Sequence, residues 1–139
     1  MKKVPTITRN VTWDEIEELV DKLAAILHNY AVEESNKILP DKNKCRVWGI
    51  PRGGIIIAAL LAHRGFELAY RTYPCAGEII VDEIADTGET LHGFAERGIV
   101  NKTAALFVRY NCKHWPDFAV EVVNDDKYLL MPWEVDYKQ

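Results

Sequence analysis

The segment from Ile79 to Thr90 constrains the fold more than any other part of the chain. It starts with a short apolar run, continues with two acids, Asp82 and Glu83, and ends in the turn sequence 86–90, which leads into a predicted helix. An apolar strand without alternating polar residues is typical of a strand covered on both faces, as in parallel sheets. The segment therefore predicts a strand-to-helix unit of an α/β fold.

The rest of the chain alternates between helical and strand patterns. Thr12 and Glu15 have capping-box spacing, and apolar residues then recur at helical intervals as far as Leu27, which predicts an amphipathic helix of about four turns. Beyond it we expect a strand at 46–50, a loop at 51–54, a helix at 55–63, strands at 66–73 and 79–81, a helix at 90–97 ended by Gly98, strands at 104–110 and 118–123, and an irregular tail over 125–139. This order predicts a doubly wound, mostly parallel sheet with helices on both faces and a short, hood-like C-terminal tail.

Length and charge narrow the class of protein. A chain of 139 residues has the size of one domain, so we expect a single domain over 1–139. The net charge of -4 gives no basic surface for nucleic acid. No apolar run approaches the roughly 20 residues of a membrane span, and the first ten residues lack the apolar centre of a signal peptide. We therefore expect a cytoplasmic protein that binds neither nucleic acid nor membranes.

The three cysteines do not form a recognisable disulfide or metal pattern. Cys45, Cys75 and Cys112 are odd in number and lack metal-pair spacing, so we interpret them as reduced thiols. Cys112 and His114 alone are too few ligands for a tetrahedral zinc site.

The residues after the strand at 79–81 suit a sugar phosphate. Ligands of parallel α/β sheets bind at the carboxyl ends of the strands. There, backbone N–H groups at a helix start attract a phosphate, and Thr87 and Thr90 add hydroxyl donors. Asp82 and Glu83 would repel a bare phosphate, but carboxylates accept hydrogen bonds from the vicinal hydroxyls of a ribose.

Two segments resemble type I phosphoribosyltransferases. VDEIADTGET at 81–90 resembles their signature for phosphoribosyl pyrophosphate, and WGIPRGGIIIAALLAHRG at 48–65 resembles their pyrophosphate loop and the helix after it. In that family a strained, often cis, peptide precedes the residue that matches Arg52, which here would be the Pro51–Arg52 bond. A simple tight turn at Pro51 is the alternative.

Further segments are similar to the bacterial xanthine-guanine subfamily, namely VTWDEIEELVDKLA at 11–24, ALFVR at 105–109 and DKYLLMPWE at 126–134. By this resemblance Arg109 contacts the 6-oxo group of a purine, Tyr128 stacks on the base, Leu129 offers a backbone carbonyl, and Glu134 replaces an aspartate. The alternatives are a surface ion pair for Arg109 and aromatic residues that pin the tail for Tyr128 and Trp133.

The resemblance implies a complete set of roles. Asp86 would be the catalytic base that accepts the N7 proton. Mg²⁺ would be the cofactor, held by Asp82, Glu83 and Glu134. Phosphoribosyl pyrophosphate and a purine base would be the substrates, and the protein would be a homodimer or homotetramer. The expected substrate-binding residues are Arg52, Gly53, Asp82, Glu83, Ala85, Asp86, Thr87, Gly88, Glu89, Thr90, Arg109, Tyr128 and Leu129.

The sequence departs from the family between Tyr73 and Ile79. Relatives carry a long mobile lid there, whereas this chain has only Pro74 to Glu78. A lid excludes water from the reacting centre. The main hypothesis is a magnesium-dependent 6-oxopurine phosphoribosyltransferase that uses guanine, xanthine or hypoxanthine. The alternatives are a non-catalytic module that binds phosphoribosyl pyrophosphate or a nucleotide, and an unrelated α/β hydrolase with a metal on Asp82, Glu83 and Asp86.

Overall fold

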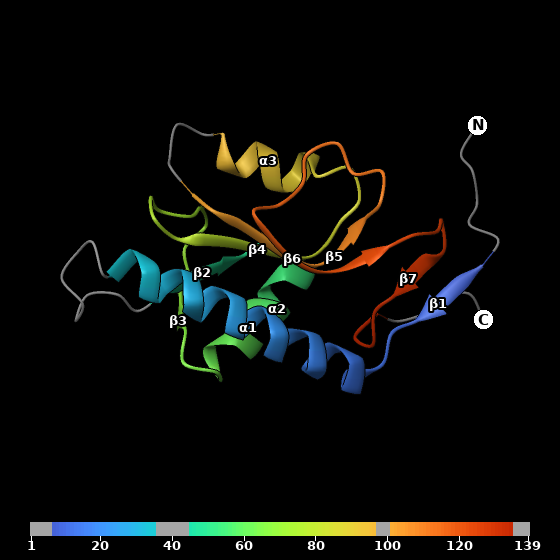
Figure 1. Cartoon of the computed structure of the whole chain (residues 1–139), viewed down its shortest axis with the longest axis horizontal. Helices are drawn as coiled ribbons and strands as arrows, with labels where there is room; N and C mark the ends of the chain where they lie inside the picture. The colour runs from blue at the N-terminus through green and yellow to red at the C-terminus, as the bar shows by residue number, and fades with distance from the viewer. Residues whose placement is uncertain (1–6, 36–44, 97–100, 135–139) are drawn as a thin grey trace.

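A five-stranded parallel sheet forms the centre of the protein, seen in a computed structural model that describes residues 7–35, 45–96 and 101–134 (Figure 1). Its strand order is β3-β2-β4-β5-β6, and every neighbouring pair is parallel. The strands are β2 Arg46–Gly49, β3 Glu67–Leu68, β4 Ile79–Ala85, β5 Thr103–Arg109 and β6 Phe118–Val123. The helices are α1 Trp13–Ser35, α2 Gly53–Ala62 and α3 Glu89–Ala95.

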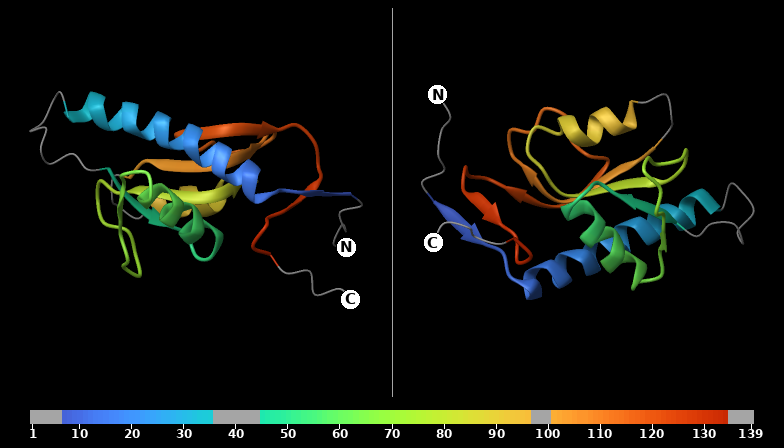
Figure 2. Two further views of the ribbon diagram at one scale, coloured as in Figure 1. Left: turned by 90° about the horizontal axis from the view of Figure 1, so that it is seen from below. Right: turned by 180° about the vertical axis from the view of Figure 1, so that it is seen from behind.

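Helices cover both faces of this sheet. α1 and α2 pack on one face, and α3 packs on the other against β4 and β5 (Figures 1 and 2). Neighbouring residues of β4 alternate between the two cores, since Ile79 and Val81 belong to the cluster under α1 and α2, whereas Ile80 belongs to the cluster under α3. Because β4 is covered on both faces, its first residues are all apolar. The predicted doubly wound fold is confirmed.

The first helix begins where the sequence predicts. The Thr12 hydroxyl accepts a hydrogen bond from the Glu15 N–H at 3.1 Å, and the Glu15 carboxylate accepts one from the Thr12 N–H at 3.2 Å. These reciprocal bonds are a capping box. The helix then continues beyond Leu27 as far as Ser35, so it is longer than its apolar pattern indicates.

Two predictions about strands are wrong. The strand expected over 66–73 is only β3, Glu67–Leu68, because the chain leaves the sheet edge after two residues. The tail expected to be irregular contains β7, Tyr128–Leu130, which pairs in parallel with β1, Thr8–Asn10, in a separate two-stranded sheet. Such short segments carry too few residues to show a strand period. Gly98 and residues 135–139 lie outside the described residues.

The short connection between β3 and β4 is tied to the body of the protein. Glu78 is only 2% exposed, and its carboxylate accepts hydrogen bonds from the Arg71 guanidinium and, at 2.8 Å, from the Cys75 N–H. Asn101 donates to the Cys75 and Glu78 carbonyls at 2.8 and 2.7 Å. This connection is therefore a closed turn, and it does not reach over the carboxyl ends of the strands.

Within the three described ranges, no helix combines the length and the apolar character that a membrane span requires.

Candidate functional site

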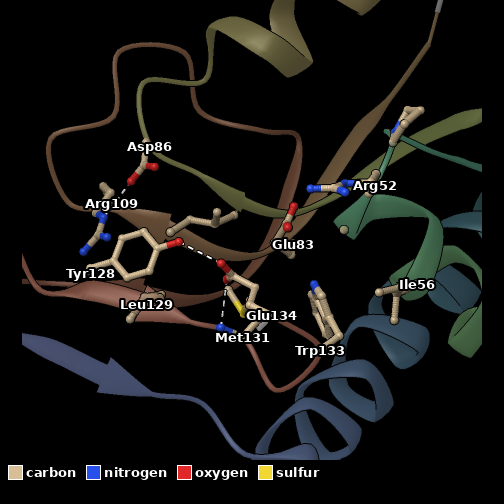
Figure 3. Close-up of a pocket in the computed structure, with 13 residues that line it drawn as sticks. Arg52, Ile56, Glu83, Asp86, Arg109, Tyr128, Leu129, Met131, Trp133 and Glu134 are labelled. Carbon is tan, nitrogen blue, oxygen red and sulfur yellow. Dashed lines mark hydrogen bonds and ion pairs between the residues drawn. The ribbon is translucent and has the colours of Figure 1, made fainter. Parts of the chain in front are cut away.

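A cavity of about 820 Å³ opens at the carboxyl ends of β4 and β5 (Figure 3). It collects residues from the start of α2, the end of β4, the end of β5 and the segment after β6. The lining residues are Pro51, Arg52, Gly53, Ile56, Glu83, Ile84, Asp86, Arg109, Tyr128, Leu129, Met131, Trp133 and Glu134. One cavity thus joins most of the chemistry that the sequence analysis singled out.

The loop before α2 forms one wall of this cavity. The Pro51–Arg52 peptide bond is cis, as the resemblance implies, and Arg52 is the residue that precedes the first turn of α2. A Cβ on Gly53 would lie 1.7 Å from Oε2 of Glu83, so the absence of a side chain lets the Glu83 carboxylate approach the start of the helix. The cation of Arg52 and the N-terminus of α2 make this wall suitable for an anion.

The two neighbouring acids of β4 lie close to each other. The Asp82 carboxylate accepts a hydrogen bond from the Glu83 N–H at 2.9 Å. Burial, together with the hydrogen bond and the negative charge of the Glu83 side chain, raises the pKa of Asp82 to about 9. Acids with a raised pKa cluster at functional sites, which favours a role in ligand binding for this pair.

The turn after β4 borders a second, smaller cavity of about 220 Å³, which is lined by residues 82 and 84–91. At its centre Gly88 has φ of 82°, and a Cβ there would lie 1.9 Å from the His114 carbonyl oxygen. The Thr87 carbonyl accepts hydrogen bonds from the Lys113 and His114 N–H groups at 3.1 and 3.0 Å. The loop after β5 therefore packs against the backbone of the turn. Thr87 and Thr90 are exposed.

Arg109 and Asp86 form an ion pair across the mouth of the larger cavity. Nε of Arg109 donates to Oδ1 of Asp86 at 2.7 Å, and Nη1 donates to the Asp125 carbonyl at 3.1 Å. The Arg109 side chain is 13% exposed and that of Asp86 is 62% exposed, so this pair lies at the surface with its cation largely covered. A guanidinium has more N–H donors than these bonds use, so Arg109 can also donate to a ligand carbonyl.

The opposite wall belongs to the segment that contains β7. Tyr128 is partly exposed, and its hydroxyl donates a hydrogen bond to Oε2 of Glu134 at 2.7 Å. The Tyr128 N–H donates to the Ile7 carbonyl at 3.0 Å, and the Leu130 carbonyl accepts from the Val11 N–H at 2.9 Å, at the two ends of β1. Because backbone groups alternate along a strand, the N–H and carbonyl of Leu129 face away from β1, on the side of the cavity.

Trp133 holds the tail, which was the alternative that the sequence offered for it, and it also has a place in the site. Its ring lies 5.7 Å from the Trp13 ring between centroids, so it pins the tail onto the start of α1. It also lines the cavity. The aromatic residues of the tail thus hold the segment and shape the site together.

The three expected metal ligands are not gathered into one group. Among the described residues, no cluster of three or more His, Cys, Asp or Glu side chains could hold a metal ion. Asp82 and Glu83 are adjacent in β4, whereas both carboxylate oxygens of Glu134 already accept hydrogen bonds from Tyr128 and Met131.

Three of the residues that line the larger cavity were not singled out in the sequence. Ile56, Ile84 and Met131 are apolar, and apolar residues at such positions are usually assigned to the core. Ile84 stands inside the motif at 81–90, between the two acids and Asp86, so its position in the motif was the one usable hint. Ala85 and Glu89, predicted to bind substrate, line the smaller cavity, as do Thr87, Gly88 and Thr90.

The fold is shared with several solved structures. A purine phosphoribosyltransferase from Pyrococcus horikoshii is 23% identical with a TM-score of 0.70, over 93% of this chain and 95% of that chain. A xanthine-guanine-hypoxanthine phosphoribosyltransferase from Helicobacter pylori is 17% identical with a TM-score of 0.63, over 94% and 96%. A hypothetical protein from Neisseria gonorrhoeae with bound ppGpp is 16% identical with a TM-score of 0.66, over 96% and 92%.

No protein-family model matches the sequence, and a search of curated proteins gives no match either. The likeness therefore lies in the arrangement of helices and strands. The chain has the type I phosphoribosyltransferase fold.

Proposed function

We propose that the protein is a phosphoribosyltransferase that joins a 6-oxopurine base to phosphoribosyl pyrophosphate and releases pyrophosphate. One observation carries this proposal: a cavity combines an anion-binding wall, the Glu83 carboxylate and a wall with a cation and an aromatic ring. Asp82 and the turn at 86–90 line a smaller cavity, which shares Ile84 and Asp86 with the larger one. Each part of the substrate pair thus has a chemically matched partner.

The phosphoribosyl half would lie along β4 and the two helix starts. The turn at 86–90 would hold the 5′-phosphate, with hydroxyl donors from Thr87 and Thr90. Asp82 and Glu83 would accept hydrogen bonds from the ribose hydroxyls. Arg52 and the backbone around Gly53 would hold the pyrophosphate.

The base would lie between Arg109 and Tyr128. Arg109 would donate to the 6-oxo group, Tyr128 would offer its ring face, and the Leu129 carbonyl would accept from the base edge. Asp86 would accept the N7 proton as the bond from N9 to ribose C1 forms and the bond from C1 to pyrophosphate breaks. Because Asp86 pairs with Arg109 at 2.7 Å, the same ion pair would contact both the proton and the carbonyl of the base.

Magnesium fits this site only as an ion held in large part by the substrate. The adjacent Asp82 and Glu83 would supply the protein oxygens, since Mg²⁺ commonly keeps one or two carboxylates, substrate phosphates and waters. When bound, the ion would neutralise negative charge on the pyrophosphate.

A second candidate function is nucleotide binding without transfer. The closed turn around Glu78 supplies no lid over the cavity, so water would reach a cationic sugar intermediate. The Neisseria gonorrhoeae protein of the same fold has ppGpp bound. A guanine nucleotide acting as a regulatory signal would suit the same phosphate, ribose and base contacts.

One assay separates these functions. Purified protein is incubated with Mg²⁺, phosphoribosyl pyrophosphate and guanine, xanthine, hypoxanthine or adenine, and both nucleotide and pyrophosphate are measured. Nucleotide formed from a 6-oxopurine but not from adenine supports the transferase. No product, combined with a melting temperature raised by guanosine nucleotides, supports the binding module instead. Hydrolysis of simple phosphate esters would point to the metal-dependent hydrolase.

A further inference from the structure

The backbone and the neighbouring residues of Tyr128 do little to fix the orientation of its side chain. It lies on β7, a strand of only three residues, and 43% of its surface is exposed. A side chain in such a place normally samples several rotamers, and fixing it costs conformational entropy. Its ring nevertheless lies against the cavity, with the hydroxyl directed at Glu134 (Figure 3).

Glu134 is itself firmly placed. Its Oε1 accepts a hydrogen bond from the Met131 N–H at 2.9 Å, and its own N–H donates to the Met131 carbonyl at 3.0 Å. Met131 is 2% exposed and belongs to the core under α1 and α2. A turn anchored in the core therefore carries the carboxylate that receives the Tyr128 hydroxyl.

We infer that Glu134 is a positioning residue that holds the Tyr128 ring against the cavity and thereby sets the affinity for the base. The inference rests on the proposed function, because it takes the cavity to be the base pocket. A carboxylate is a stronger acceptor than a neutral group, so a tyrosine and an acid suit each other at these two positions. The hydrogen bond to Glu134 and partial burial raise the pKa of Tyr128, in accord with this pairing.

A positioning role and a metal-binding role for Glu134 would affect different parts of the ligand. A metal ligand would act on the pyrophosphate and ribose side, whereas a support for Tyr128 acts on the base alone. Both oxygens of Glu134 accept hydrogen bonds from the protein, at 2.7 and 2.9 Å. The carboxylate thus has its full set of partners without a metal ion.

The test compares the binding of two ligands by titration calorimetry, GMP and ribose 5-phosphate. The variants are Tyr128→Phe, Glu134→Gln and the double variant. Each single change should weaken GMP by about fivefold or more, because the ring loses the bond that orders it. The double variant should be no weaker than the weaker single variant, since both remove the same bond. Ribose 5-phosphate should bind equally in all of them.

Two controls and one spectroscopic readout complete the test. Tyr70→Phe and Glu18→Gln make the same chemical changes at residues that are 86% and, for the side chain, 70% exposed, and should bind GMP as the unchanged protein does. Thermal melts check that each variant is folded. The difference between ultraviolet titrations of proteins with Tyr128 and with the Tyr128→Phe change isolates this phenol among the six tyrosines, and it should give a lower pKa in the Glu134→Gln background than in the unchanged one.

The outcomes separate this inference from the proposed function. Normal GMP binding by both single variants, with an unchanged phenol titration, overturns the inference and leaves the function standing. A loss of ribose 5-phosphate binding in Glu134→Gln also overturns it, in favour of the phosphate or metal side. If the unchanged protein binds neither ligand, the proposed function fails and the inference fails with it.

Discussion

Arg109 donates from Nε to Oδ1 of Asp86 at 2.7 Å, so the cation expected to read the base and the carboxylate expected to take its proton are bonded to each other. Arg109 is the last residue of β5, and Asp86 is the first residue after β4. Residues in such direct contact do not act independently. Changes at either one should therefore affect the other, and the two roles need separate measurements.

Asp86→Asn should lower kcat by about 100-fold or more, because an amide cannot accept the N7 proton. The Asn carbonyl can still accept the hydrogen bond from Arg109, so nucleotide binding should change little. Rapid-mixing assays of nucleotide formation, together with calorimetric titration of GMP, measure the two effects. An unchanged kcat would remove Asp86 from the role of base.

Arg109→Ala should raise KM for the purine about tenfold or more, with a much smaller effect on KM for phosphoribosyl pyrophosphate. The reason is that the guanidinium lies on the proposed base side of the cavity, away from Arg52. Steady-state kinetics with each substrate varied in turn gives both constants. Equal losses for both substrates would show that Arg109 does not face the base. Arg64→Ala, at an arginine that pairs with Glu17 and Asp21 of α1, is the control.

Asp82→Asn should make the ligand-free protein more stable at alkaline pH. The pKa of Asp82 is about 9 in the folded protein, above its ordinary value of 3.8. Between these values the folded state keeps a proton that the unfolded state releases, so this residue lowers the free energy of unfolding as pH rises. The asparagine removes this penalty, and the gain at about pH 8 should be about 1 kcal/mol or more.

Urea unfolding in the presence of a chelator, at about pH 5 and about pH 8, measures this gain. The advantage of the variant should be larger at the higher pH. Asp126→Asn, a change at an exposed aspartate, controls for the general effect of removing a negative charge. A gain that is the same at both pH values would contradict the raised pKa.

Glu78→Ala should destabilise the protein by about 2 kcal/mol, because it removes the hydrogen bonds that the Arg71 guanidinium and the Cys75 N–H donate to a buried carboxylate. The same change at Glu18, which makes only an exposed pair with Lys22 at 3.6 Å, should cost less than about 1 kcal/mol. Chemical unfolding compares the two variants. If they lose equal stability, the turn before β4 is not held by Glu78.

Gly88→Ala should abolish phosphate binding and destabilise the protein by about 2 kcal/mol or more, since φ is 82° and the new Cβ would lie 1.9 Å from the His114 carbonyl oxygen. Gly77→Ala is the matched control, with φ of 87° and nothing within 4 Å of the new Cβ. It should cost only the backbone strain, about 1 kcal/mol, and leave ribose 5-phosphate binding intact. Equal effects of the two changes would show that the contact with His114 does not matter.

The sequence was informative wherever local chemistry decides the structure. The capping box at Thr12, the apolar strand that starts at Ile79 and the turn at 86–90 into a helix each depend on residues a few positions apart, and all three are present, although the strand continues past Asp82 to Ala85. The order of helices and strands then restricts the topology, because parallel strands need helical crossovers. The residues proposed to hold the ribose and the phosphate lie on these local elements.

Only the tertiary structure shows how the residues proposed to contact the base are held. β1 and β7 pair with each other, and each residue of β1 lies opposite a residue 120 positions further along the chain. Neither three-residue segment shows a strand pattern by itself. The ion pair of Arg109 with Asp86 and the hydrogen bond of Tyr128 with Glu134 depend on side-chain positions that spacing does not encode. Short-range preferences determine which element a segment forms, whereas contacts between distant segments determine which side chains meet around the cavity.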